Sequence, residues 1–219
     1  MLDLVLGNNA DSTRKFLFLG AHCDDIDIGC GGTAAMLAER YPTAQFHWVI
    51  FSATPRRERE ARASIDRLLA PSQHRNVIVK DFRNGFFPFV AADVKEFFET
   101  LKDTVVPDLV FTHFRHDRHQ DHRTISELTW NTFRDHLVLE YEIAKYEGDL
   151  SHPNLFIPLE ARICDLKVDT LVSCFESQGD KQWFDQETFR ALLRIRGIEC
   201  NSPTRYAEAF HCAKARIYL

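Results

Sequence analysis

Short apolar runs alternate along the chain with longer stretches in which apolar residues recur at helical spacing. The runs at 16–20, 46–51, 76–80 and 108–112 are rich in Phe, Val, Ile and Leu. Their length and their polar or turn-forming flanks predict buried strands. Between the second and third runs, residues 57–69 have the apolar spacing of an amphipathic helix. This alternation predicts a Rossmann-like, doubly wound α/β fold, with a mostly parallel sheet and helices on both faces.

The remaining pattern extends the same organisation to the end of the chain. Thr33 is a plausible N-cap for a helix that Tyr41-Pro42 would end. The other predicted elements are helices at 32–40, 93–103, 123–136, 161–176 and 185–196, and strands at 138–143, 154–157, 206–212 and 215–218. Without a repeat or linker in 219 residues, we expect a single domain over 1–219 with a sizeable core.

A dense polar cluster follows the first predicted strand. Ala21-His22-Cys23-Asp24-Asp25 comes directly after the apolar run, and three glycines follow within seven positions. Neighbouring side chains of a strand point to opposite faces, so a turn is needed to bring these side chains together. His and Asp are ligands for zinc or ferrous iron, and an adjacent Asp can act as a base. The alternative is a polar turn in which an Asp caps the next helix.

A second cluster follows the strand at 108–112. Four of the ten histidines lie in this stretch, namely His113, His116, His119 and His122. In open parallel sheets, ligand sites form beyond the carboxyl ends of the strands. The two clusters therefore predict one composite site. We expect His113 and His116 to brace the loop rather than bind a metal.

The two clusters resemble the motifs of the PIG-L/LmbE-like zinc-dependent deacetylases. The first is similar to the family's Ala-His-Pro-Asp-Asp, and Asp117-Arg118-His119-Gln120-Asp121-His122 is similar to its Asp-x-His-x-Asp-His. Cys23 replaces the family's proline, and Asp27 stands where a glutamate is common. Residues 206–210 resemble the family's closing strand. The resemblance extends over most of the chain and implies a single LmbE-like deacetylase domain of the soluble, bacterial type.

The resemblance implies that His22, Asp25 and His122 bind a metal. Two imidazoles and one carboxylate, with a position left for water, form the ligand set of a catalytic rather than a structural zinc. Ferrous iron is the alternative ion for this set. The competing interpretation makes the first two turn residues and the third a helix cap.

The same resemblance assigns the chemistry to three further residues. Asp24 would be the general base, taking a proton from water and returning it to the leaving amine. His119 would favour the ionised base or stabilise the oxyanion. Asp121 would hold the imidazole of His119 in the useful tautomer.

Substrate contacts are harder to assign from the sequence. Arg57 could pair with Glu60 on a helix surface, whereas the resemblance implies that it reaches sugar hydroxyls. Four phenylalanines in the loop after the third strand are more often core or loop-packing residues than a sugar platform: Phe82, Phe86, Phe87 and Phe89.

Composition and charge exclude several classes of protein. The formal net charge is −5 and no basic patch is present, which argues against a nucleic-acid partner. No apolar stretch approaches the roughly 20 residues of a membrane span. The six cysteines form no C-x-x-C pair, and the chain starts without a signal-peptide pattern. We therefore expect a cytoplasmic protein with reduced thiols.

These observations predict a zinc-dependent N-deacetylase. The resemblance implies a small-molecule substrate, an N-acetylated amino sugar of the N-acetylglucosamine type, and a tendency of the family to form homo-oligomers. The alternatives are hydrolysis of another amide or an O-acetyl ester at the same site, and a non-catalytic sugar- or metal-binding relative. A mere binding protein would not need Asp24, which argues against the last alternative.

Overall fold

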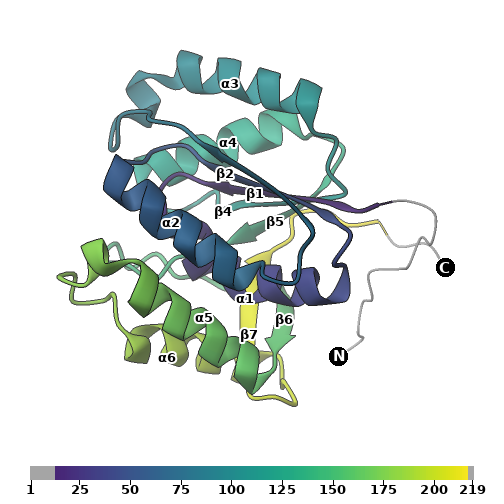
Figure 1. The fold of residues 1–219 in the computed structure, drawn as a ribbon, viewed down its shortest axis with the longest axis vertical. Coiled ribbons are helices and arrows are strands. Elements are labelled where there is room, and N and C mark those ends of the chain that lie inside the picture. The colour runs from purple at the N-terminus through teal and green to yellow at the C-terminus, as the bar shows by residue number, and fades with distance from the viewer. Residues whose placement is uncertain (1–12, 217–219) are drawn as a thin grey trace.

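A seven-stranded sheet between two layers of helices forms the protein in the computed structural model, which describes residues 13–216 (Figure 1). The strands are β1 (Lys15–Gly20), β2 (Gln45–Ile50), β3 (His74–Val79), β4 (Leu109–His113), β5 (Leu137–Tyr141), β6 (Leu155–Leu159) and β7 (Tyr206–His211). The helices are α1 (Asp25–Arg40), α2 (Pro55–Leu68), α3 (Ala91–Thr104), α4 (Gln120–Thr132), α5 (Ala161–Cys174) and α6 (Gln186–Glu199), with short 3-10 turns η1 (Phe87–Phe89) and η2 (Glu176–Gln178).

The strand order is β3-β2-β1-β4-β5-β7-β6, and the first five strands in this order are parallel. From β1 the chain winds outward through β2 and β3, and then returns to build β4 and β5 on the other side. This reversal places the topological switch point between β1 and β4, where open α/β sheets bind ligands. β7 runs antiparallel to both β5 and β6.

Two apolar cores lie on opposite faces of the sheet because the strand side chains alternate. Phe16 and Phe18 belong to the core under α1, α2, α5 and α6, whereas Leu17 and Leu19 belong to the core under α3 and α4. Figure 1 shows these two helical layers below and above the sheet. The predicted doubly wound, mostly parallel fold is confirmed. In residues 13–216, no helix is long and apolar enough to cross a membrane.

Three predicted elements differ from the observed ones by more than three residues or do not form. α1 begins at Asp25, seven residues before the predicted start, and is interrupted at Cys30 (φ −147°, ψ 22°). Thr33, the expected cap, lies inside this helix. α4 covers Gln120–Thr132 instead of 123–136. No strand forms at 215–216, and the rest of the strand expected at 215–218 lies outside the described residues.

Candidate functional site

The turn after β1 brings the first polar cluster to the carboxyl edge of the sheet. Beyond Gly20 the chain turns through His22 and enters α1 at Asp25. The backbone N–H of His22 donates to Oδ2 of Asp25 at 2.6 Å, which fixes the carboxylate over the turn. His22, Asp24 and Asp25 are each at most 7 % exposed. The polar side chains of this turn therefore face the interior.

The loop after β4 supplies the second cluster at the same edge. His119 is the N-cap of α4, and its Nδ1 accepts a hydrogen bond from the backbone N–H of Asp121 at 3.2 Å. Its backbone N–H donates to Oδ1 of Asp117 at 2.7 Å. His122 lies in the first turn of α4 and is 3 % exposed. The predicted convergence of the two strand ends is therefore present in the fold.

The three residues expected to bind a metal form a triangle of donor atoms. Nδ1 of His22 lies 3.2 Å from Nε2 of His122 and 3.2 Å from Oδ2 of Asp25. Nε2 of His122 and Oδ2 of Asp25 are 3.5 Å apart. A tetrahedral zinc with bonds of about 2.0–2.2 Å separates its ligand atoms by about 3.3–3.6 Å. This donor set and its spacing fit a zinc ion or a similar divalent metal.

Two other histidines lie close to this triangle. Donor atoms of His22, His119 and His122 lie within 4.8 Å of one another, and so do those of Asp25, His113 and His122. Nε2 of His113, however, accepts the backbone N–H of Ala21 at 2.9 Å, and this bond occupies its lone pair. His113 therefore braces the turn after β1, rather than the loop that carries the second cluster. Its ring also stacks on that of His122 at 4.0 Å between centroids.

A carboxylate contacts the outer nitrogen of each imidazole of the triangle. Oδ2 of Asp121 lies 3.3 Å from Nε2 of His22, and Oδ2 of Asp117 lies 2.9 Å from Nδ1 of His122. Nζ of Lys145 is 2.9 Å from the same Asp117 oxygen. Such contacts leave Nδ1 of His22 and Nε2 of His122 free to face a metal. The sequence interpretation assigned no role to Asp117 or Lys145, although Asp117 is the first residue of the second motif.

The Asp121 carboxylate does not hold the imidazole of His119 as expected; only the backbone N–H of Asp121 contacts that ring. Besides His22, the Asp121 carboxylate accepts the backbone N–H groups of Gly85 at 2.6 Å and Phe87 at 3.1 Å. Asp121 is in the first turn of α4, so its side chain points to the loop after β3 while His119 caps the helix. Asp121 therefore joins a ligand histidine to this loop.

Arg57 contacts the expected general base. Its Nη2 donates to Oδ1 of Asp24, while the pairing with Glu60 belongs to the neighbouring Arg56, at 3.4 Å. Glu60 instead accepts the backbone N–H of Ser177 at 3.0 Å. The interpretation of Arg57 as a partner of Glu60 is therefore wrong. Its guanidinium fixes Asp24 from the first turn of α2.

The electrostatics of the cluster favour a cation. Burial lowers the pKa of His22, but the charges and hydrogen bonds of Asp25 and Asp121, with Asp24, outweigh burial and raise it to about 10. Burial raises the pKa of Asp25, but His122, His22 and His113 bring it well below its usual range. The pKa of His119 is lowered, first by burial and then by the neighbouring imidazoles. His119 is therefore neutral near pH 7.

Among the described residues, the Cys23 thiol belongs to neither group of side chains that could hold a metal ion. Its Sγ donates to the backbone carbonyl of Ser52 at 3.6 Å, and burial raises its pKa to about 12. A buried, protonated thiol that is engaged in this way is not a metal ligand. The replacement of the family's proline by Cys23 therefore leaves the donor set unchanged.

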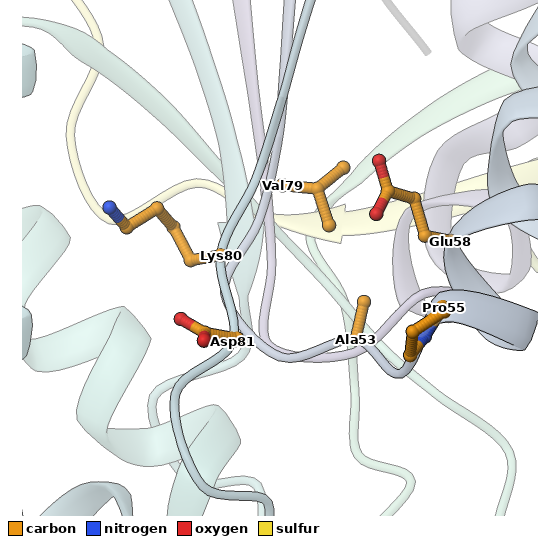
Figure 2. A pocket seen from close by; sticks show the side chains of 6 residues that line it. All are labelled: Ala53, Pro55, Glu58, Val79, Lys80 and Asp81. Carbon is orange, nitrogen blue, oxygen red and sulfur yellow. The ribbon is translucent and has the colours of Figure 1, made fainter.

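A pocket of about 290 Å³ lies at the carboxyl ends of β2 and β3, beside the start of α2. Figure 2 shows its lining, with the carboxylates of Glu58 and Asp81 on either side of the strand that carries Val79. It contains none of the ligand residues, but Glu58 follows Arg57 directly in α2. The remaining lining residues are Ala53, Pro55 and Lys80.

The loop after β3 divides its four phenylalanines between the core and the surface. Phe87 is buried, and its ring lies 6.2 Å from that of His22, while Phe82 is half-buried. Phe86 and Phe89 are 37 % and 75 % exposed. The expected core role holds for the first two. The rings of Phe86 and Phe89 lie 6.0 Å apart and pack on each other within the loop, which is the expected loop packing.

The arrangement is that of a doubly wound α/β protein with a buried His/Asp cluster at the switch point of its sheet. Residues 17–133, a little over half of the chain, match the family described as PIG-L: GlcNAc-PI de-N-acetylase, and the chain belongs to this family. This membership confirms the prediction of a deacetylase-type hydrolase. Comparison of the sequence with curated proteins gave no significant match.

Solved structures share the whole fold. N,N'-diacetylchitobiose deacetylase from Pyrococcus horikoshii is 18 % identical, with a TM-score of 0.68 over 90 % of this chain and 83 % of the other. A zinc-inhibited form of the teicoplanin deacetylase Orf2 is 14 % identical, with a TM-score of 0.66 over 90 % and 97 %. GalB, a 4-carboxy-2-hydroxymuconate hydratase from Pseudomonas putida KT2440, is 17 % identical, with a TM-score of 0.73 over 94 % and 99 %. Identities this low establish the common fold alone.

Proposed function

We propose that this protein is a zinc-dependent deacetylase that removes the N-acetyl group from an N-acetylated amino sugar. The observation that carries the proposal is the triangle of donor atoms from His22, Asp25 and His122, with edges of 3.2–3.5 Å. A fourth polar group, Asp24, lies beside a ligand and is not needed as one. This division between three ligands and one further carboxylate supports hydrolysis rather than metal storage.

The side chains around the triangle supply the proton transfers. A zinc ion held by the three ligands would polarise the acetamide carbonyl and make water a better nucleophile. Asp24 takes a proton from the attacking water, and the same proton then goes to the amide nitrogen as the C–N bond breaks. Arg57 keeps the Asp24 carboxylate aimed at this position. His119, neutral and half-buried, donates a hydrogen bond to the developing oxyanion. The products are acetate and a free amine.

The proposed substrate class depends on family membership and on the surroundings of the site. N-acetylated sugars appear in the names of the matched family and of the Pyrococcus horikoshii relative. Next to Arg57, the pocket in Figure 2 offers the carboxylates of Glu58 and Asp81, which can accept hydrogen bonds from hydroxyl groups. We place the sugar ring between Arg57 and this pocket, with its acetamide at the triangle.

Metal content and deacetylation together test the proposal. The purified protein is expected to bind about one zinc or iron ion per chain and the His122→Ala variant none. Incubation with a panel of N-acetyl sugars should then release acetate in proportion to metal content. A chain that binds no metal after zinc is offered would contradict the proposal. A metal-loaded chain that releases acetate from esters or other amides, but from no N-acetyl sugar, would support a metal-dependent hydrolase and contradict the proposed sugar substrate.

A second reaction class has specific support in the fold. The structure with a TM-score of 0.73 is named as a hydratase. Hydration also needs a positioned water and a base, so the same panel should include an unsaturated hydroxy acid. If the protein turned over that compound but released no acetate from the N-acetyl sugars, hydration would become the better assignment of its activity.

A further inference from the structure

The helix that carries a proposed ligand is broken one turn after its start. Asp25 is the first residue of α1, and the backbone leaves helical geometry at Cys30 (φ −147°, ψ 22°). In an unbroken helix the N–H of Gly32 would donate to the carbonyl of Ile28. A break in this place separates the first turn, which bears Asp25, from the long remainder of the helix.

A buried ion pair occupies the break. The N–H of Gly32 donates to Oε1 of Glu208 at 2.8 Å, and that of Thr33 donates to Oε2 at 2.6 Å. Nζ of Lys167 donates to the carbonyl of Ile28 at 2.6 Å and contacts Oε1 of Glu208 at 2.6 Å. The pair is therefore inserted between the two backbone groups that would otherwise bond each other, a recognised cause of helix kinks.

The surroundings leave the pair little freedom. Lys167 and Glu208 are each 3 % exposed. A Cβ atom on Gly32 would lie 2.7 Å from Cδ1 of Leu159 and 3.1 Å from Oε1 of Glu208, so glycine is required for this close approach. A buried ion pair is seldom retained for stability, because desolvation offsets much of the attraction. The position that the pair imposes on the backbone of Ile28, Gly32 and Thr33 better explains why it is buried here.

The separated first turn is fixed on its other side by an aromatic ring. A Cβ atom on Gly29 would lie 2.2 Å from Cδ2 of Tyr141, so the turn lies directly on this ring. The Tyr141 hydroxyl donates to the carbonyl of Leu19 at 2.7 Å. Contacts from β5, α5 and β7 thus determine how the first turn is oriented relative to the end of β1.

We propose that Lys167 and Glu208 are positioning residues of the metal site, which hold the first turn of α1 so that Asp24 and Asp25 face the two histidine ligands. The inference rests on the proposed function, because it concerns the geometry of the proposed zinc ligands. Both residues lie beyond the segment 17–133 that matches the family. The last third of the chain therefore helps to define a site whose ligands all come from the first 122 residues.

The test removes the buried pair and compares it with an equally buried one elsewhere. The variant is Lys167→Met with Glu208→Gln, which keeps the side-chain volumes. The control is Arg196→Met with Glu142→Gln, since Arg196 and Glu142 are 5 % and 7 % exposed and pair at 2.6 Å. For each protein, the zinc dissociation constant is measured by competition with a chelator, and the visible spectrum of bound Co²⁺ reports ligand geometry. Circular dichroism checks the fold.

The expected result is that the dissociation constant for zinc rises at least about tenfold in the Lys167/Glu208 variant, with an altered Co²⁺ spectrum. The control variant should match the wild type in both measurements. Equal effects of the two substituted pairs, or wild-type zinc affinity in the Lys167/Glu208 variant, would overturn this inference but leave the proposed function intact. A wild-type chain that binds no zinc would overturn the proposed function as well. Should the double variant not fold, Glu208→Gln alone is measured in the same way.

Discussion

Arg57 of α2 and Asp24, the residue that precedes α1, meet at the carboxyl edge of the sheet, where Nη2 of the guanidinium donates to Oδ1 of the carboxylate. Burial lowers the pKa of Arg57, but the Asp24 charge outweighs burial and raises it, so the guanidinium stays charged. The first turn of α2 thus fixes the side chain of a residue that follows β1. This contact ties any movement of the first turn of α2 to the position of the proposed base.

The first prediction separates two roles of Arg57. In Arg57→Lys the point charge remains but the planar fork is lost, so the base is held less firmly. We expect kcat to fall about tenfold or more with little change in KM. The matched control is Arg56→Lys, because Arg56 is the preceding residue and pairs with Glu60. A rise in KM with unchanged kcat would instead assign Arg57 to substrate binding alone.

The second prediction concerns Asp24 itself. Asp24→Ala should retain metal, since none of the three ligands is changed, and kcat should fall by about 10²–10⁴. Metal content by elemental analysis and acetate release are measured on the same preparation. Asp66→Ala, which removes an exposed carboxylate paired with Arg75, serves as the control. Full activity in Asp24→Ala would contradict its role as the base.

The third prediction distinguishes Asp121 from His119. Asp121 orients His22 and holds the loop at Gly85, so Asp121→Asn should weaken zinc binding about 10–100-fold. His119→Ala should keep the metal and lower kcat about 10²-fold or more, because only the oxyanion contact is lost. Chelator competition and kinetics on both variants provide the check. If Asp121→Asn lowered kcat without weakening zinc binding, Asp121 would act on His119 rather than on His22, which would contradict the observed contact.

The fourth prediction is a pH dependence of zinc affinity. His22 has a pKa of about 10 in the metal-free protein, and a ligand imidazole must be unprotonated. Zinc binding near pH 7 therefore displaces about one proton, and apparent affinity should rise about tenfold per pH unit up to about pH 9. Calorimetry in buffers of different ionisation enthalpy measures the proton count. A value near zero would show that His22 is already neutral without metal.

The fifth prediction concerns Asp27, which is fully buried and accepts a hydrogen bond from the Ser64 hydroxyl. Burial raises its pKa from 3.8 to about 8. The folded chain thus keeps a proton that the unfolded chain releases, so Asp27 destabilises the fold increasingly as pH rises from about 4 to about 8. Asp27→Asn should raise the unfolding midpoint near pH 8 by more than near pH 5. An equal shift at both pH values would contradict the raised pKa.

The strands and the composite site were readable from the sequence because both depend on local patterns. Uninterrupted apolar runs predict buried strands whatever their partners are, and parallel strand ends meet at one edge. His22 and Asp25 follow the end of β1 within five residues, and His122 follows the end of β4 by nine. Their convergence was expected because parallel strand ends meet at one edge, while the resemblance to the family supplied their roles.

Contacts between distant residues were not readable in the same way. The glycines of α1 disfavour a helix locally, so the sequence predicts a helix that starts later than the observed Asp25. Tyr141 and Glu208, which are distant in sequence, pack against the first turns of α1 and support the helix there. The partner of the Asp121 carboxylate differs from the predicted one for a similar reason. Its neighbour in sequence is His119, but its hydrogen bonds go to a loop more than thirty residues earlier.

The bonds from Glu208 to Gly32 and Thr33 also determine when the site can be completed during synthesis. Translation proceeds from the amino terminus, and domains form as their segments leave the ribosome. The residues of the triangle emerge first, while the carboxylate that fills the break in α1 is translated 86 residues after His122. A nascent chain that has exposed both motifs therefore still lacks the carboxylate that, in our proposal, holds the first turn of α1 in place.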